Sequence, residues 1–344
     1  MKRIIYIIFF AILSVMSFSQ VVSFDLSDTA LSAEEVKAKT GKAVKLIYPT
    51  SMKSKIPAME CNVQVDGLGP FSVAEGRQVM FAHGNLQFNA AQGSHQCADG
   101  TTQKGTWRFA EHQWDYVGDA SNGNVYHNGT KCDNANISET YDGWIDLFGW
   151  GTSGWNSGAV AYQPWSTSQS YSDYHPGNNY QNNLTGAYAN ADWGVYNQIG
   201  SAAPGTWRTL TYAEWNYVYS GRANANNLIG QATVNGVTGF ILLPDDWEAP
   251  SGITFTAGTS LNFTTNTYTT DQWEQMEQRG AVFLPSGGYR GGSNVGNVGS
   301  YGDFWSVSQY SSNYAWYLDF SDGKSGMDGS NRGSGRSVRL SQDL

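Results

Sequence analysis

Charged residues are what this sequence has least of. Only 14% of its 344 residues are charged, whereas an ordinary soluble domain has roughly 25%. Lys and Arg together number 20 against 29 Asp and Glu, so the formal net charge is -9. Nucleic acid and anionic membrane surfaces attract proteins with a basic face. The composition therefore argues against both as partners.

Cysteine is also scarce. Cys61, Cys97 and Cys132 all lie in the first half of the chain. Cys97 and Cys132 flank a polar, glycine-rich stretch and could form a disulfide in an oxidising compartment, which would leave Cys61 over. No C-x-x-C pair is present and the five His are scattered, so we predict no metal site and no cofactor.

Long hydrophobic runs are confined to the N-terminus. Lys2 and Arg3 precede an apolar run over residues 4–15, and Ser17-Phe18-Ser19 supplies small residues for cleavage before Gln20. This pattern predicts a signal peptide over residues 1–19. The alternative, a membrane anchor, would need a run of roughly 20 apolar residues. We therefore expect an exported chain that is periplasmic, on the cell surface or secreted, with no membrane insertion after cleavage.

Glycine and aromatic residues are abundant. The chain has 40 Gly, 13 Trp, 20 Tyr and 15 Phe, enough to bury a large core. Residues 20–66 carry several lysines and no Trp, which indicates an N-terminal arm or linker. Residues 67–344 have a uniform composition, so we predict one domain there.

Short helices and short strands alternate within this domain. We expect helices over residues 106–118, 211–221 and 269–280, each with a Thr start, a central Trp and a glycine stop. Asn235-Gly236 predicts a hairpin between residues 232–234 and 238–243. Further strands are expected at residues 78–81 and 85–88 on either side of a Gly84 turn, and at 281–284, 304–308, 315–320 and 337–340. The fold class is therefore α+β.

Motifs for catalysis are almost absent. The sequence has no G-x-S-x-G, Walker or H-E-x-x-H motif. The glycine-rich run at residues 287–292 contains no Lys and is interpreted as a loop. Asp245 and Asp246 could serve a glycosidase or bind calcium, but a turn at the end of a strand is the commoner use of such a pair.

A set of motifs in the last third resembles a known family. These are, in order, Gly280-Ala-Val-Phe-Leu-Pro285, Gly288-Tyr-Arg290, Val298-Gly-Ser-Tyr-Gly302, Phe304-Trp-Ser306, Ala315-x-Tyr-Leu-x-Phe320, Arg332 and Gly335-Arg-Ser-Val-Arg-Leu340. Upstream motifs fit the same pattern: Thr106-Trp-Arg-Phe109, Trp144-Ile-Asp-Leu-Phe-Gly-Trp-Gly151, Asp192-Trp-Gly-Val-Tyr196 and Trp207-Arg-Thr-Leu-Thr211.

Together these motifs resemble the C-type-lectin-fold domain of exported Bacteroidetes proteins, which is related to the Fibrobacter succinogenes major paralogous domain. They are also similar to the variable proteins of diversity-generating retroelements and, more distantly, to the formylglycine-generating enzyme. The resemblance implies a compact core whose last strands and loops display a ligand-binding face. The formylglycine-generating enzyme uses a pair of C-terminal cysteines, which this sequence lacks. The E-P-N, Q-P-D and W-N-D tripeptides of calcium-dependent lectins are also missing.

The resemblance divides the C-terminal strands into framework and displayed positions. Framework residues would be Trp305, Ala315, Leu318, Phe320, Arg332, Gly335 and Val338. The displayed, ligand-binding positions would be Asp303, Val307, Gln309, Tyr310, Ser311, Asn313, Tyr314, Trp316, Asp319, Asp322, Lys324, Met327, Asp328, Ser330 and Asn331. Tyr and Trp give such a surface rigid contact area, and Ser, Gly and Asn give it adaptable hydrogen bonds.

Three hypotheses for the function follow. The favoured one is an exported, non-enzymatic binding or adhesion protein that recognises a protein or a glycan, diversified by a retroelement or fixed. The others are a structural module of a surface appendage tethered through residues 20–66, and a carbohydrate-active enzyme that uses Asp245 or Asp246. The oligomeric state is left open by the sequence.

Overall fold

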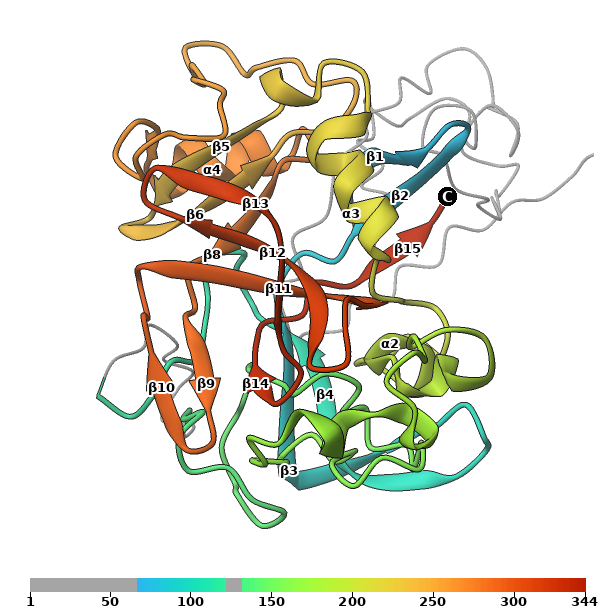
Figure 1. Cartoon of the computed structure of the whole chain (residues 1–344). Coiled ribbons are helices and arrows are strands. Elements are labelled where there is room, and N and C mark those ends of the chain that lie inside the picture. The colour runs from blue at the N-terminus through green and yellow to red at the C-terminus, as the bar shows by residue number, and fades with distance from the viewer. Residues whose placement is uncertain (1–66, 122–131) are drawn as a thin grey trace, which may run out of the picture. The chain divides into compact units, whose positions relative to one another are not determined.

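The computed structural model describes residues 67–121 and 132–344. Within it, Gly67–Asp343 form one compact unit by their internal contacts (Figure 1). The predicted signal peptide over residues 1–19, the arm over residues 20–66 and Cys61 lie outside the described residues. In the described part of the chain, no helix is long and apolar enough to cross a membrane.

Strands make up most of the regular structure of this unit. In chain order they are β1 (Leu68–Ala74), β2 (Arg77–Phe81), β3 (Leu86–Gln96), β4 (Thr102–Phe109), β5 (Ile229–Val234), β6 (Val237–Leu242), β7 (Thr267–Tyr268), β8 (Val282–Pro285), β9 (Tyr289–Gly291), β10 (Asn294–Gly296), β11 (Tyr301–Gln309), β12 (Tyr314–Ser321), β13 (Lys324–Asn331), β14 (Ser334–Gly335) and β15 (Ser341–Asp343).

The helices are short. They are α2 (Trp193–Tyr196), α3 (Tyr212–Asn216), which continues as the π-helical turn η4 (Tyr217–Gly221), α4 (Thr270–Glu277), and the 3-10 turns η1 (Tyr171–Tyr174), η2 (Pro176–Asn178), η3 (Gly186–Ala191) and η5 (Ala225–Asn227). A few helices set among small, mostly antiparallel sheets make the fold class α+β.

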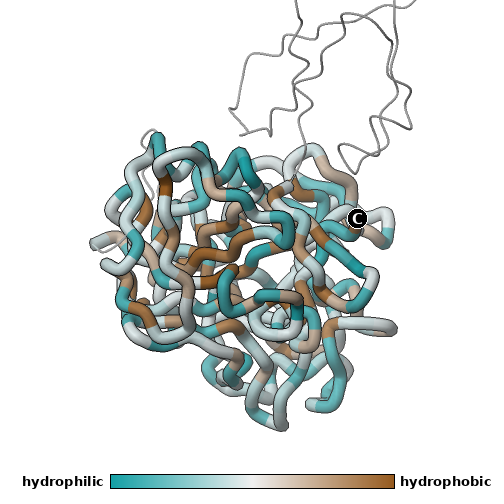
Figure 2. The backbone as a smooth tube through the Cα atoms, turned by 90° about the horizontal axis from the view of Figure 1, so that it is seen from above, coloured by the Kyte–Doolittle hydropathy of each residue, from teal (hydrophilic) through white to brown (hydrophobic). Residues whose placement is uncertain are grey.

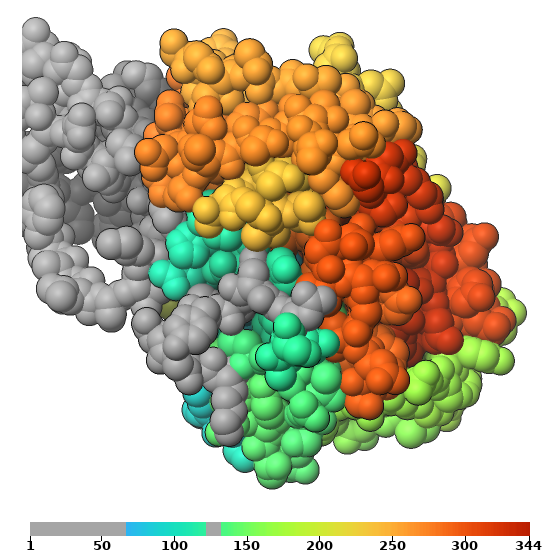
Figure 3. Space-filling view, turned by 90° about the vertical axis from the view of Figure 1, so that its left-hand side faces the viewer, coloured from blue at the N-terminus to red at the C-terminus, as the bar shows by residue number. Residues whose placement is uncertain are grey.

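The strands form several small sheets. Their orders are β1-β2-β15, β3-β4, β7-β5-β6-β8, β10-β9-β14 and β11-β12-β13. All pairs are antiparallel except β5 with β7. Because β15 pairs with β2, the two ends of the described domain meet in one sheet. On the face shown in Figure 3, the β9–β10 hairpin and the C-terminal strands, orange to red, adjoin one another.

Buried aromatic side chains fill three core clusters. One surrounds Trp107, Trp193 and Trp305, the second surrounds Trp215 and the third surrounds Trp273. Figure 2 shows the most hydrophobic segments in the interior of the described domain and the hydrophilic ones mainly at its surface. The high Trp content is thus largely a packing requirement, because each of these side chains buries a large apolar area.

The predicted hairpin turn and the predicted starts of two helices are confirmed. Asn235 and Gly236 both have positive φ, 49° and 80°, as a type I′ turn between β5 and β6 requires. Thr211 and Thr269 both form capping boxes at the starts of α3 and α4. Buried Trp215 and Trp273 anchor these two helices, as predicted.

The predicted helix over residues 106–118 is wrong. Residues up to Phe109 belong to strand β4, where Trp107 lies opposite Phe88 of β3, and the rest of the segment is irregular. The helical spacing from Thr106 to Trp114 was overridden by pairing with β3, a long-range contact. Trp114 is nevertheless buried, in the cluster that contains Trp273.

Two further predictions near the chain ends need correction. Gly84 does not join a hairpin, because β2 pairs with β1 and β15 whereas β3 pairs with β4. Residues 337–340 lie between β14 and β15 and are not a strand of their own. They are still tied to other segments, because the carbonyls of Val338 and Leu340 accept the N–H groups of Leu86 and Ala82 at 2.9 Å.

The disulfide candidate is not formed. Cys97 lies at the end of β3 in a bridge to Asn197, and Cys132 lies in a bridge to Trp144. No disulfide joins Cys97 to Cys132 in the described structure. Burial raises the pKa of both thiols, so neither has the depressed pKa of a reactive cysteine.

Candidate functional site

The three-stranded sheet β11-β12-β13 builds the candidate site. Successive side chains of a strand point to opposite faces, and Phe304, Leu318 and Met327 share one face through their register. Phe304 and Leu318 are buried in a core cluster, and Met327 packs against it. The same face continues along β12 to Trp316 and Tyr314, beyond the edge of that cluster.

An aromatic cluster covers this end of the face. It consists of Tyr212, Tyr310, Tyr314 and Trp316. The Tyr212 ring stacks on Trp316 with centroids 4.1 Å apart, and Tyr310 meets Trp316 edge-on at 4.3 Å. Tyr310 and Tyr314 are 48% and 42% exposed, and their rings lie parallel within 4°. The cluster thus presents two tyrosine rings to solvent on a packed aromatic base.

A bulge and a tight loop position the cluster. The register of β11 against β12 shifts between Trp305 and Gln309. Within the bulge, the N–H and carbonyl of Val307 bond to Leu210 and Leu184 instead of β12. The loop then closes through the N–H groups of Tyr310 and Ser311, which both donate to the Tyr314 carbonyl. Gly329 of β13 leaves room for the Tyr310 ring, which lies where a Cβ at this position would be.

Buried Arg332 supports the loop from below. Its guanidinium donates to the carbonyls of Tyr180 at 2.7 Å, Ser311 at 2.8 Å and Tyr314 at 3.4 Å. The same group lies over the Trp150 ring, 4.6 Å from its centroid. Burial lowers the pKa of Arg332 to about 10, so the side chain stays cationic at neutral pH. Arg332 is a framework residue, as predicted, and it orders two loops at once.

The loop that holds Tyr180 extends the site. Tyr171 and Tyr180 are 39% and 43% exposed, and His175 lies between them, 6.1 and 6.3 Å from the two rings. His175 Nε2 donates to the Ser312 carbonyl at 2.7 Å, and burial lowers the pKa of His175. Sequence reasoning missed Tyr171, His175, Tyr180 and Tyr212, because only the tertiary structure brings them next to residues 310–316.

Three positions predicted as displayed are not on the surface. Asp303 and Val307 are 2% exposed and Asp319 is 3% exposed. Val307 lies in the same core cluster as Trp305, two residues before it, as the alternation of side chains along a strand predicts. Asp303 contacts the Arg336 guanidinium beneath the opposite face of the sheet, and burial raises the pKa of Asp303. Asp319 Oδ2 lies 2.8 Å from Lys324 Nζ.

The remaining predicted positions lie in three regions besides Met327, which packs against the core. The cluster, with Gln309, Ser311, Asn313 and Asn331, occupies one end of the β11-β12-β13 sheet. Asp322 and Lys324 lie at the other end, where Asp322 Oδ1 accepts the Phe263 N–H at 2.8 Å. Asp328 and Ser330 point to the opposite face, where Ser330 Oγ contacts Arg336. The fifteen positions therefore do not form one surface.

The residues predicted as framework share one property. All seven of its residues are buried, namely Trp305, Ala315, Leu318, Phe320, Arg332, Gly335 and Val338.

Asp245 is occupied by structural contacts. Its carboxylate accepts from the Ser72 N–H and hydroxyl at 2.7 Å, from Gln78 at 3.0 Å and from Arg222 at 3.1 Å. Although burial opposes ionisation, these hydrogen bonds keep the pKa of Asp245 below its usual value. Such a group anchors β1 to the turn after β6 and is poorly suited to act as a general acid.

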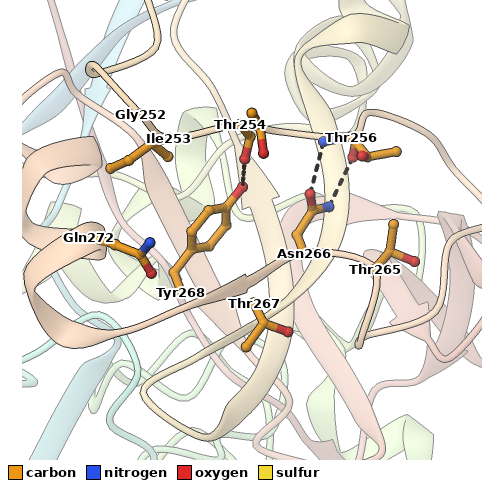
Figure 4. Close-up of a pocket in the computed structure, with 9 residues that line it drawn as sticks. All are labelled: Gly252, Ile253, Thr254, Thr256, Thr265, Asn266, Thr267, Tyr268 and Gln272. Carbon is orange, nitrogen blue, oxygen red and sulfur yellow. Dashed lines mark hydrogen bonds between the residues drawn. The ribbon is translucent and has the colours of Figure 1, made fainter.

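A small polar cavity of about 200 Å³ lies away from the cluster, beside β7 and the start of α4 (Figure 4). The Tyr268 hydroxyl donates to the Thr254 carbonyl at 2.7 Å, and Asn266 bonds the backbone of Thr256 in both directions at 2.8 and 2.9 Å. These hydrogen bonds join the walls of the cavity to each other. Because the polar groups of Asn266 are already hydrogen-bonded, the cavity shows no indication of a ligand site.

The comparisons with known proteins are brief. Residues 257–341 match a family described as a domain of unknown function (DUF8237). Neither a curated protein nor a solved structure is significantly similar to the chain. The matched segment runs from just before β7 to the start of β15 and includes Tyr310, Tyr314 and Trp316. Tyr212 lies outside it.

Proposed function

We propose that this protein is an exported, non-enzymatic binding or adhesion protein with a C-type-lectin-like domain. Its ligand would be a protein or a glycan, held on the face built by β12, β13 and the loop between β11 and β12. The observation that carries the proposal is the aromatic cluster, in which the Tyr310 and Tyr314 rings stay exposed beside the stacked pair of Tyr212 and Trp316.

The chemistry of the cluster favours binding. Large aromatic rings are costly to leave in water and are enriched in binding surfaces, where they lose little conformational entropy. Trp316 is held by Tyr212 and Tyr310, and the loop is held by Arg332, so the face is ordered before a ligand arrives. A preformed face binds more tightly because less freedom is lost on association.

A combined glycan and protein array tests the proposal. The full chain should bind a discrete set of ligands, and Tyr310→Ala, Tyr314→Ala and Trp316→Ala should each weaken that binding. Tyr301→Ala is the matched control, because Tyr301 is also exposed, at 39%, but its side chain lies on the opposite face of the same sheet. Equal binding by the parent and all cluster variants would refute the proposed face.

The retroelement version of the proposal has its own test. A reverse-transcriptase gene beside this one, with a near-copy of codons 290 to 340, would support a diversified face. Its absence would leave a fixed binder. If the face is diversified, the buried residues Asp303, Val307 and Asp319 should stay constant among the variants, because substitutions there would alter packing.

A further inference from the structure

Strand β13 is one of the two outer strands of the β11-β12-β13 sheet. It pairs with β12 through a two-residue turn, so Ser321 and Lys324 face each other across the end of the hairpin. In an antiparallel pair, hydrogen-bonded and non-hydrogen-bonded partners alternate. A two-residue loop makes the flanking pair, Ser321 and Lys324, hydrogen-bonded. Counting along β13 from Lys324, every second residue is then bonded to β12. The backbone groups of the residues between them, which include Met327, Gly329 and Asn331, face the outer edge.

Other contacts agree with this alternation. The Ser325 carbonyl, two residues before Met327, accepts the Tyr219 hydroxyl at 2.9 Å from outside the sheet. On β11, the Trp305 N–H and the Asp303 carbonyl also point away from β12, toward Ser337. Both observations place every second backbone unit outside the β12 ladder.

Much of this outer edge lacks partners. Among residues 67–121 and 132–344, the N–H and C=O of Met327 and Asn331 and the C=O of Gly329 make no hydrogen bond outside the β11-β12-β13 sheet. The Gly329 N–H donates to the Asp328 carboxylate at 2.7 Å. Exposed strand edges of this kind are templates for another strand.

The open edge adjoins the aromatic cluster. A strand added antiparallel to β13 would place the side chain opposite Gly329 on the same face as Gly329 itself. That position is next to the Tyr310 ring, which lies against Gly329. Backbone hydrogen bonds would thus supply affinity and the cluster would select side chains, which is how strand-addition complexes divide the two tasks.

We infer that the ligand is an extended polypeptide segment that pairs with β13 and places alternate side chains on the aromatic cluster. This inference rests on the proposed function and specifies its partner. The exposed Asp328 at the edge and the net charge of -9 favour a neutral or basic segment over an acidic one. Glycan binding is the competing outcome.

Linear peptides of about ten residues, long enough to pair along an edge strand, are the probe. A phage-displayed random library is selected on the full chain, and the best peptide is then made with one backbone N-methyl group at each position in turn. Methylation should weaken binding about tenfold at every second residue, where the N–H faces β13, and leave the intervening residues unaffected. Hydrogen exchange should show the Met327 and Asn331 amides protected only when the peptide is bound.

Variants of the chain separate this inference from the proposed function. Met327→Pro removes one outward N–H, and Met327→Leu is its matched control. Weaker binding by Met327→Pro and Trp316→Ala, with Met327→Leu unchanged, is the expected result. If Trp316→Ala abolishes binding while methylation shows no alternation and Met327 stays unprotected, the face is real but strand addition is wrong.

Other outcomes also decide the matter. Selection of glycans alone, with no peptide that depends on Trp316, overturns the inference and keeps the proposed function. Concentration-dependent dimers with a protected Met327 amide overturn it too, because a second copy would then cover the edge. Because the methyl groups are on the peptide, the alternation test is independent of any folding defect in the Met327→Pro variant.

Discussion

Tyr212 stacks on Trp316 at 4.1 Å between ring centroids, with the planes inclined by 26°. The contact joins the first residue of α3 to the third residue of β12. Since Trp316 is also contacted by Tyr310, the two tyrosines hold the indole from two sides. The stacked Tyr212 and Trp316 rings therefore support the exposed tyrosine rings of the candidate site.

Removing Tyr212 should loosen Trp316. We expect Tyr212→Ala to expose the indole and lower the free energy of unfolding by about 1 kcal/mol, since the stacking contact and some burial are lost. Quenching of Trp fluorescence by acrylamide should increase. Tyr212→Phe keeps the ring and should behave like the parent; an equal change in both variants would contradict the stacking explanation.

Removing the Arg332 guanidinium should disorder the loops around the cluster. Arg332→Met leaves the carbonyls of Tyr180, Ser311 and Tyr314 without their buried donor. We expect the free energy of unfolding, measured in urea, to fall by about 3 kcal/mol. Arg332→Lys keeps the charge but not the forked donors, so its loss should be smaller. A loss below about 1 kcal/mol in Arg332→Met would show that these bonds are replaced by water.

A methyl group at Gly329 should displace the Tyr310 ring. A Cβ at Gly329 would overlap Tyr310 Cδ1, and an exposed side chain can move away at little cost. Gly329→Ala should therefore weaken ligand binding while unfolding changes by less than about 1 kcal/mol.

Gly326 of the same strand provides the control. A Cβ there meets nothing within 4 Å, so Gly326→Ala should leave both binding and stability unchanged. If both alanine variants bind like the parent, Tyr310 does not contribute to recognition from the position seen here.

Mild acid should stabilise the domain through Glu277. Burial raises the pKa of Glu277 to about 7 from 4.5, so the folded state binds this proton more tightly than the unfolded state. Stability contributed by this group is then lost as pH rises toward and through 7, and is fully present below 4.5. From pH 8 to pH 5 we expect a gain of roughly 2 kcal/mol in the free energy of unfolding.

Glu277→Gln tests the assignment, since a neutral side chain cannot titrate. Burial also raises the pKa of Asp146 and Asp192 to about 6 and raises the pKa of Asp303, so these groups should leave part of the pH dependence in the variant. The difference between variant and parent isolates Glu277. A parallel pH profile for the two proteins would contradict the prediction.

Much of the C-terminal framework could be predicted from the sequence, because five of its seven residues are apolar, namely Trp305, Ala315, Leu318, Phe320 and Val338. The displayed set was predicted less well. Gln309, Tyr310 and Tyr314 are at the surface. Asp303 and Val307 instead share the face of buried Trp305, where Asp303 contacts Arg336 and Val307 packs in the core. Their two-residue spacing from Trp305 is a local signal for this burial, whereas the contact of Asp303 with Arg336 has none in residues 303–319.

The scarcity of charge, the Asn235-Gly236 turn and the capping boxes at Thr211 and Thr269 were determined by the sequence alone. Each depends on composition or on hydrogen bonds between residues close in the sequence, so it can be predicted without knowing which distant segment lies alongside. The tertiary structure alone decided that Trp107 belongs to a strand, that Tyr212 stacks on Trp316, and that Arg332 ties Tyr180 to Tyr314. These outcomes depend on which distant segment lies alongside, and burial and long-range pairing there outweigh local preference.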